Sequence, residues 1–132
     1  MDRKDRRADG QAELWVSVNR LDGWTVASLA GQIDIFTVPG LRAHLKELVA
    51  DHGERPQVIV DLGAVTFCDA HGLGALIGAH KSAARRGGAV RVVVPKGRVR
   101  RLLHITEPTH DLEVHETLSD AVAVDPLGHS HA

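Results

Sequence analysis

Apolar and polar residues alternate near the start of the chain. Leu14, Val16 and Val18 alternate with Trp15 and Ser17, and after a turn around Gly23 the alternation resumes. A two-residue period on both sides of a glycine-containing turn is typical of a β-hairpin. We therefore expect residues 14–29 to form two antiparallel strands.

Later segments have the three- and four-residue spacing of amphipathic helices. Residues 38–48 place leucines on one face, and residues 72–86 show the same pattern before a basic turn and two glycines. Thr37 is the expected N-cap of the first helix, because a hydroxyl residue before a proline in the first turn is a preferred start. Shorter helices are predicted over residues 97–104 and 119–124.

Two further runs, residues 57–62 and 89–94, are continuously apolar and rich in β-branched side chains. This composition is typical of strands that are buried on both faces of a sheet. Residues 112–117 add a short final strand. The resulting order, β-β-α-β-α-β-α-β-α, predicts an α/β domain with a mixed sheet of about five strands, about four helices and right-handed crossovers.

The composition agrees with one small domain. The chain has 132 residues, of which 43% are hydrophobic and 25% charged, and its formal net charge is -1. We expect a single domain over residues 13–124 between flexible tails at residues 1–12 and 125–132. A near-neutral chain without a long apolar run or a signal-peptide pattern indicates a cytoplasmic protein that binds neither nucleic acid nor membrane.

Cysteine, aspartate and histidine occur together at Cys68, Asp69 and His71. A cysteine nucleophile activated by His71 is one interpretation, but Cys68 follows an apolar run and is expected to pack into the core. A metal site would need a ligand from elsewhere, and the nearby glycines match neither common phosphate-binding pattern. The simplest interpretation is an interaction loop in which Asp69 caps a helix and His71 faces a partner. We therefore expect no catalytic residue, metal or cofactor.

The stretch VIVDLGAVTFCDAHGLGALIGAHKSAARRGGAVRVV resembles the core of a STAS domain of the anti-sigma factor antagonist family. That core contains an apolar strand, an Asp-Ser-Ser/Thr-Gly-Leu loop and a helix ending in Arg-Gly-Gly. Residues 29–34 are similar to the family's Gly-Glu-Leu-Asp stretch. The resemblance extends over about residues 13–124, and its motifs follow one another in the family's order.

The resemblance implies a non-enzymatic protein that binds an anti-sigma factor, a GHKL-type serine kinase, and so releases a sigma factor to regulate transcription. In that family the kinase phosphorylates the second hydroxyl residue of the loop, and a PP2C-like phosphatase removes the phosphate. The implied partner-binding residues are Asp34, Asp69, Ala70, His71, Gly72, Leu73 and Gly74. His71 occupies the phosphoacceptor position without a hydroxyl, so the ordinary phosphorylation switch is not expected.

Other interpretations of the same residues stay open. His71 could accept phosphate on a ring nitrogen, although a neutral surface imidazole needs fewer assumptions. The domain could instead bind a nucleotide or another small ligand at a helix N-terminus, or serve as a scaffold in a stress-signalling assembly. A monomer or a weak dimer is compatible with all of these functions.

Overall fold

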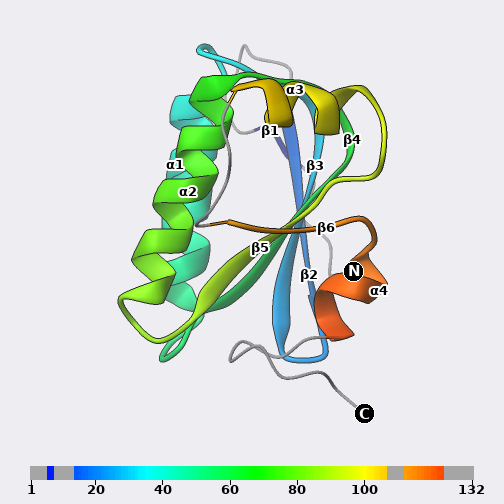
Figure 1. The fold of residues 1–132 in the computed structure, drawn as a ribbon. Helices are drawn as coiled ribbons and strands as arrows, with labels where there is room; N and C mark the ends of the chain where they lie inside the picture. The colour runs from blue at the N-terminus through cyan, green and yellow to red at the C-terminus, as the bar shows by residue number, and fades with distance from the viewer. Residues whose placement is uncertain (1–5, 8–13, 107–111, 124–132) are drawn as a thin grey trace.

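A computed structural model describes residues 6–7, 14–106 and 112–123 of the chain. Among these residues a six-stranded mixed sheet carries two long helices on one face and a short helix on the other (Figure 1). The strands are β1 (Arg6–Arg7), β2 (Leu14–Leu21), β3 (Trp24–Ile33), β4 (Gln57–Cys68), β5 (Ala89–Val93) and β6 (Glu113–His115). The helices are α1 (Val38–Asp51), α2 (Ala70–Ala84), α3 (Arg98–Thr106) and α4 (Leu118–Ala123).

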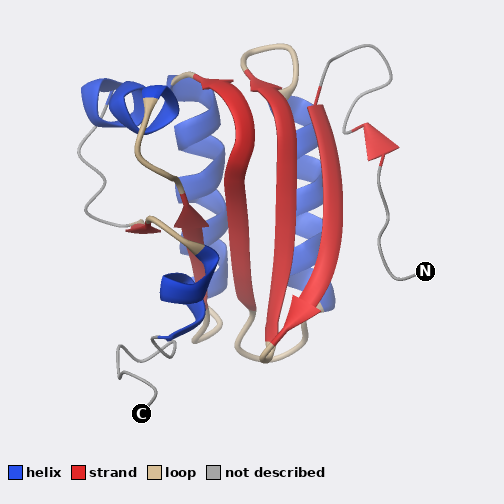
Figure 2. Ribbon diagram, turned by 90° about the vertical axis from the view of Figure 1, so that its right-hand side faces the viewer, coloured by secondary structure: helices blue, strands red, loops and turns tan. Residues whose placement is uncertain are grey.

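The strands lie side by side in chain order, β1-β2-β3-β4-β5-β6. β1, β2 and β3 pair antiparallel, whereas each neighbouring pair from β3 to β6 is parallel. The connections through α1 and α2 both step to the next strand in the same direction. Right-handed crossovers therefore place both helices on the same face of the sheet, where Figure 2 shows them behind the strands.

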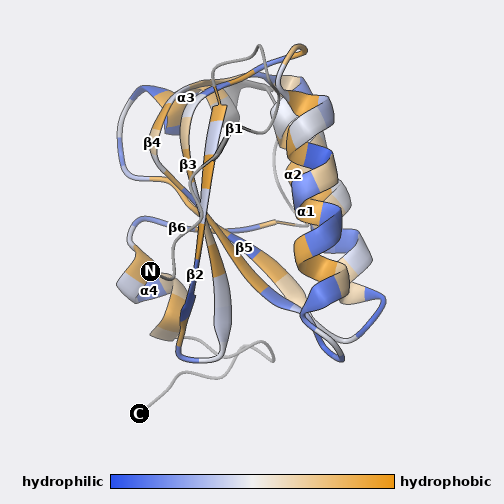
Figure 3. Cartoon of the chain, turned by 180° about the vertical axis from the view of Figure 1, so that it is seen from behind, coloured by the Kyte–Doolittle hydropathy of each residue, from blue (hydrophilic) through white to orange (hydrophobic). Residues whose placement is uncertain are grey.

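The main core lies between this helix pair and the sheet. It contains leucines of α1 and α2, represented by Leu41, Leu45 and Leu76, together with buried valines of β4 and β5 such as Val60 and Val92. Figure 3 shows largely hydrophobic central strands and helices that also carry hydrophilic segments. This distribution explains the two patterns in the sequence, because a central parallel strand is covered on both faces and a surface helix on only one.

A smaller core lies on the opposite face, under α4. Trp24 and Ile59 of the sheet pack there with Ala121 of α4. Arg91 of β5 is only 2% exposed in the same region, and its Nε lies 2.6 Å from an oxygen of Glu113. Its guanidinium also donates to the Ala121 carbonyl at 2.7 Å and lies 4.5 Å from the centroid of the Trp24 ring. One buried cation therefore joins the sheet to β6 and α4.

The α/β class and the order of the predicted elements are confirmed, and β1 is an additional strand. Arg6–Arg7 pairs antiparallel with β2. Two arginines carry no apolar alternation, so the sequence pattern did not predict this strand. The remainder of the expected tails, and residue 124 of the last predicted helix, lie outside the described residues.

The central strand β4 is longer than the predicted residues 57–62. We expected Gly63 to end it, but the strand continues to Cys68. Asp61 Oδ1 accepts a hydrogen bond from the Gly63 amide at 2.8 Å, and the register against β3 shifts near this point and again close to the strand end. Gly63 therefore lies in a local irregularity of the strand, which is a common position for a strand glycine.

Candidate functional site

Two loops meet at the carboxyl ends of β3 and β4. Ile33 at the end of β3 pairs with Cys68 at the end of β4, and the Asp69 amide donates to the Ile33 carbonyl at 3.1 Å. The turn that leads into α1 therefore lies beside the start of α2, at the upper end of Figure 1. This position, outside the carboxyl ends of adjacent parallel strands, is where α/β proteins commonly place binding residues.

Asp34 shapes the first loop. Its Oδ1 accepts hydrogen bonds from the Phe36 amide at 2.9 Å and the Thr37 amide at 3.1 Å. Its backbone carbonyl accepts from the Val38 amide at 2.9 Å. These contacts form the compact turn before α1, so Asp34, predicted for its resemblance to a family motif, also has a structural role.

Thr37 precedes α1 as predicted, but its side chain does not cap the helix. Its hydroxyl donates to the Gln32 carbonyl and accepts from the Asp34 amide, both at 2.9 Å. The residue is helical in backbone conformation and 2% exposed, so its oxygen faces back toward the loop. The prediction of Thr37 as the N-cap is therefore confirmed by position, but the side-chain hydrogen bond that usually accompanies an N-cap is not formed.

Two large apolar side chains project from this turn. Ile35 is 56% exposed and Phe36 is 76% exposed. Neither residue was predicted from the sequence, although an apolar pair between Asp34 and the helix start, outside either periodic pattern, was a usable signal. Exposed apolar groups of this size beside a helix terminus suit contact with another molecule.

Asp69 caps α2, as predicted. Its Oδ1 accepts from the His71 amide at 2.9 Å and the Gly72 amide at 3.2 Å, so α2 begins at Ala70 rather than at Gly72. His71 Nδ1 lies 3.4 Å from Asp69 Oδ2, and 57% of the His71 side chain is exposed. The cap holds the carboxylate close to the imidazole at the start of the helix.

The predicted binding residues that follow differ in exposure. Ala70 and Gly74 are exposed, whereas Gly72 is buried and Leu73 is only 2% exposed. Gly72 and Leu73 offer little exposed surface because their helical positions turn them toward the core, and their part in partner binding stays a prediction. We use the name loop face for the exposed residues of this region together with Asp34: Asp34, Ile35, Phe36, Ala70, His71 and Gly74.

The sequence profile of the STAS domain matches residues 16–121, which is most of the chain. The chain belongs to the STAS-domain family. This STAS domain is 31% identical over 91 residues to the anti-sigma-B factor antagonist of Bacillus subtilis, an alignment that covers 69% of this chain and 81% of that protein.

Solved structures agree with this assignment. An anti-sigma factor antagonist from Mycobacterium paratuberculosis superposes with a TM-score of 0.74 at 30% identity, over 86% of this chain and 95% of that one. A STAS-domain protein from Planctomyces limnophilus superposes with a TM-score of 0.68 at 19% identity, over 81% of this chain and 93% of that one. The second likeness supports the fold alone.

The cysteine beside the loop face of this STAS domain lies inside the core. Cys68 is 1% exposed, and its Sγ lies 3.7 Å from the Asp69 carbonyl oxygen. Burial, with a smaller contribution from the Asp69 charge, raises the pKa of the thiol to about 12. A thiol with this pKa is protonated at neutral pH, so the prediction of an inward-facing cysteine is confirmed and the nucleophile interpretation loses its support.

Histidines elsewhere in the STAS domain have structural contacts. His80 Nδ1 accepts from the Val90 amide at 3.1 Å, and His52 Nδ1 lies 3.1 Å from the Thr25 hydroxyl. Burial and the nearby Arg20 and Arg86 lower the pKa of His52.

In residues 6–7, 14–106 and 112–123, no three His, Cys, Asp or Glu side chains are grouped so that they could hold a metal ion. Across the same ranges, no helix has the length and apolar character needed to cross a membrane.

Proposed function

We propose that this STAS domain is an anti-sigma factor antagonist that works by binding rather than by catalysis. Its loop face contacts an anti-sigma factor, which releases the sigma factor and so regulates transcription. The observation that carries the proposal is Phe36, an aromatic side chain that is 76% exposed in the turn directly before α1. Aromatic side chains, including phenylalanine, are enriched in the buried centres of protein interfaces.

The relatives support the same role. Two proteins that are 31% and 30% identical to this chain are named anti-sigma factor antagonists. Both alignments cover more than two thirds of each partner, so the likeness applies to whole domains and not to a shared fragment. The loop face combines two exposed apolar side chains, Ile35 and Phe36, with the Asp34 carboxylate next to them in the chain.

We further propose that the anti-sigma factor is a GHKL-type serine kinase and that this loop does not respond to its kinase activity. Residues 69–74 contain no hydroxyl side chain, and His71 occupies the phosphoacceptor position. A phosphoryl group would add about -1.5 to -2 charges next to Asp69 and disrupt a docked interface. Without an acceptor oxygen this disruption does not occur, and a PP2C-like phosphatase has no substrate in the loop.

Binding of the full chain to GHKL-type kinases from the same genome, measured by calorimetry, tests the proposal. Phe36→Ser removes the exposed aromatic group, and we expect the affinity to fall by about thirtyfold, the equivalent of a binding hot spot of about 2 kcal/mol. Leu21→Ser is the matched control, because Leu21 is also an exposed apolar residue, 38% exposed. It is the last residue of β2 and pairs with the first residue of β3, at the end of the sheet away from the loop face. This control should bind like the wild-type protein.

Two results would contradict the proposal in different ways. If the wild-type chain binds none of these kinases, the proposed function is wrong. If it binds a kinase and Phe36→Ser binds equally well, the function stands but the loop face is not the interface.

A further inference from the structure

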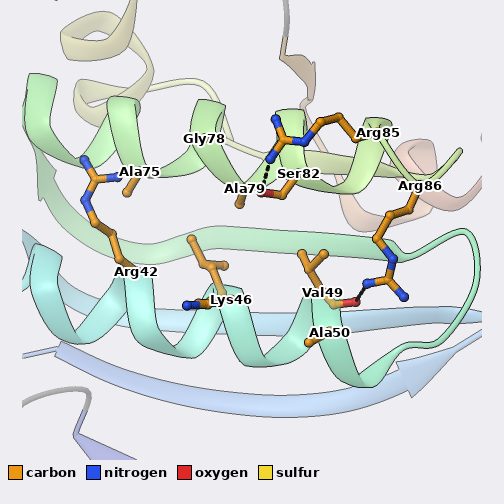
Figure 4. A pocket seen from close by; sticks show the side chains of 11 residues that line it. Arg42, Lys46, Val49, Ala50, Ala75, Gly78, Ala79, Ser82, Arg85 and Arg86 are labelled. Atoms are coloured by element: carbon orange, nitrogen blue, oxygen red, sulfur yellow. Dashed lines mark hydrogen bonds between the residues drawn. The ribbon is translucent and has the colours of Figure 1, made fainter.

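A groove runs along the outer surface between α1 and α2, on the side of the helix pair that faces away from the sheet (Figure 4). It has a volume of about 480 Å³. Small and apolar side chains of the two helices, with Ser82, form its floor. Four cations border it: Arg42, Lys46, Arg85 and Arg86. Among the described residues that line the groove, none is acidic.

Three of these cations lack a carboxylate partner within the described part of the chain. Arg42 and Lys46 are one turn apart on α1, a spacing at which like charges repel. Arg85 donates to the Ser82 hydroxyl at 3.1 Å, which leaves its charge uncompensated. Arg86 links the end of α2 to the end of α1, because it donates to the Val49 carbonyl at 2.8 Å and to the Gly53 carbonyl. An anionic occupant would relieve the concentration of positive charge.

The position of Arg42 brings its charge over the groove. A Cβ placed on Gly74 would lie 3.8 Å from one guanidinium nitrogen, and a Cβ placed on Gly78 would lie 3.9 Å from the other. The side chain therefore extends from α1 across to α2 (Figure 4). Because α2 has only small residues at this crossing, the Arg42 guanidinium lies close to α2 and leaves the groove open further along.

The spacing of the cations favours an elongated anion over a compact one. The lining residues of α2 run from Ala75 to Arg86, which corresponds to about 16 Å along a helix, or about three turns. A single phosphate cannot reach cations distributed over this length. The first-turn amides of both helices, the usual backbone donors to phosphate, lie toward the loop face and not along the groove.

We propose that the α1/α2 groove docks an acidic amphipathic helix of a partner protein. Its apolar side chains lie on the floor between the two helices, and its carboxylates face Arg42, Lys46 and Arg85. Helix-in-groove binding of this kind uses apolar anchors at three- and four-residue spacing, with charge complementarity setting the orientation. This second surface adjoins the loop face where Arg42 lies beside Gly74, but its lining residues are different, and it does not depend on the proposed function.

Selection from a displayed library of random helical peptides about three to four turns long tests the inference on the full chain. Selected peptides should be acidic on one face and apolar on the other, and their amide shifts should map to residues 42–50 and 75–86. The double variant Arg42→Glu/Lys46→Glu should bind them about tenfold more weakly, and added salt should weaken wild-type binding. Arg98→Glu/Arg101→Glu in α3 carries the same change in net charge, lies outside the groove and should bind normally.

Several results would overturn the inference. These are a library that yields no binder, peptides without acidic enrichment, shifts outside the groove, or equal loss of binding in both double variants. The chain is also titrated with ATP and with inorganic phosphate. If these compact anions shift the amide signals of the groove and the library yields no peptide, the ligand of the groove is a small anion and not a helix. Kinase binding by Arg42→Glu/Lys46→Glu is measured in parallel. Peptide binding reports on the groove and kinase binding reports on the loop face, so the two proposals can be refuted independently.

Discussion

A single added methyl group should destabilise this domain at Gly72 and stabilise it at Gly74. Both glycines lie in α2, two residues apart, so their intrinsic helix propensities are similar. Replacing a helical glycine by alanine gains about 0.5–1 kcal/mol when the new Cβ has room. The surroundings of the two positions therefore decide the sign of the effect.

At Gly72 the new Cβ would overlap Ile33 Cγ2 and lie 2.7 Å from Cys68 Sγ. Both neighbours are buried, with exposures of 0% and 1%, so neither can move into solvent. Overpacking of this kind costs about 1–3 kcal/mol, which exceeds the gain in helix propensity. We expect Gly72→Ala to lower the free energy of unfolding by about 1–2 kcal/mol.

At Gly74 the nearest atom to the new Cβ is Arg42 Nη2, at an ordinary contact distance of 3.8 Å. This atom is the end of a flexible, exposed side chain, so any adjustment costs little. We expect Gly74→Ala to raise the free energy of unfolding by about 0.5–1 kcal/mol.

Urea unfolding followed by tryptophan fluorescence measures both changes, because Trp24 is 2% exposed and reports loss of the core. The two midpoints should move in opposite directions with unchanged slopes. In a Cys68→Ala background the penalty of Gly72→Ala should shrink, since one of the two close neighbours is gone. A Gly72→Ala protein at least as stable as Gly74→Ala would refute the packing argument.

Three further predictions concern other residues. Arg91→Met leaves the Ala121 carbonyl without its donor and should lower the free energy of unfolding by about 2–3 kcal/mol, with early loss of hydrogen-exchange protection in residues 113–123. The Cys68 thiol has a pKa of about 12 in the folded state and 9.0 when unfolded. The free energy of unfolding should therefore fall as the pH rises from about 9 to about 12, and Cys68→Ala should remove this component of the pH dependence. His71→Ser restores a hydroxyl, so incubation with a cognate kinase and ATP should add one phosphoryl group, seen by intact mass, and weaken binding; equal labelling of the wild-type chain would contradict this.

Periodicity predicted most of the secondary structure correctly because each face of a long helix or strand is either buried or exposed along most of its length. The hairpin, α1, α2 and the buried strands all follow their patterns. The errors lie at ends and irregularities: β4 passes through Gly63, and α2 starts before Gly72 because Asp69 caps it. A glycine is compatible with both a strand irregularity and a strand end, and the pairing with β3 determines which one forms.

The candidate site was predicted in part. The resemblance to the family pointed to Asp34 and residues 69–74, and the structure brings these two loops together because β3 and β4 are parallel neighbours. It did not indicate that Leu73 is buried or that Phe36 is exposed. An apolar residue in a loop can pack inward or project outward, and the sequence pattern does not distinguish these outcomes.

Local chemistry thus accounts for the order of strands and helices, the capping role of Asp69 and the inward direction of Cys68, because each depends on residues close together in the chain. Arg91 and the α1/α2 groove required the folded molecule. Arg91 is tolerated in a buried strand only because Glu113, Ala121 and Trp24 surround its charge. The basic groove exists because two helices from separate crossovers lie side by side, and that contact is a property of the assembled sheet.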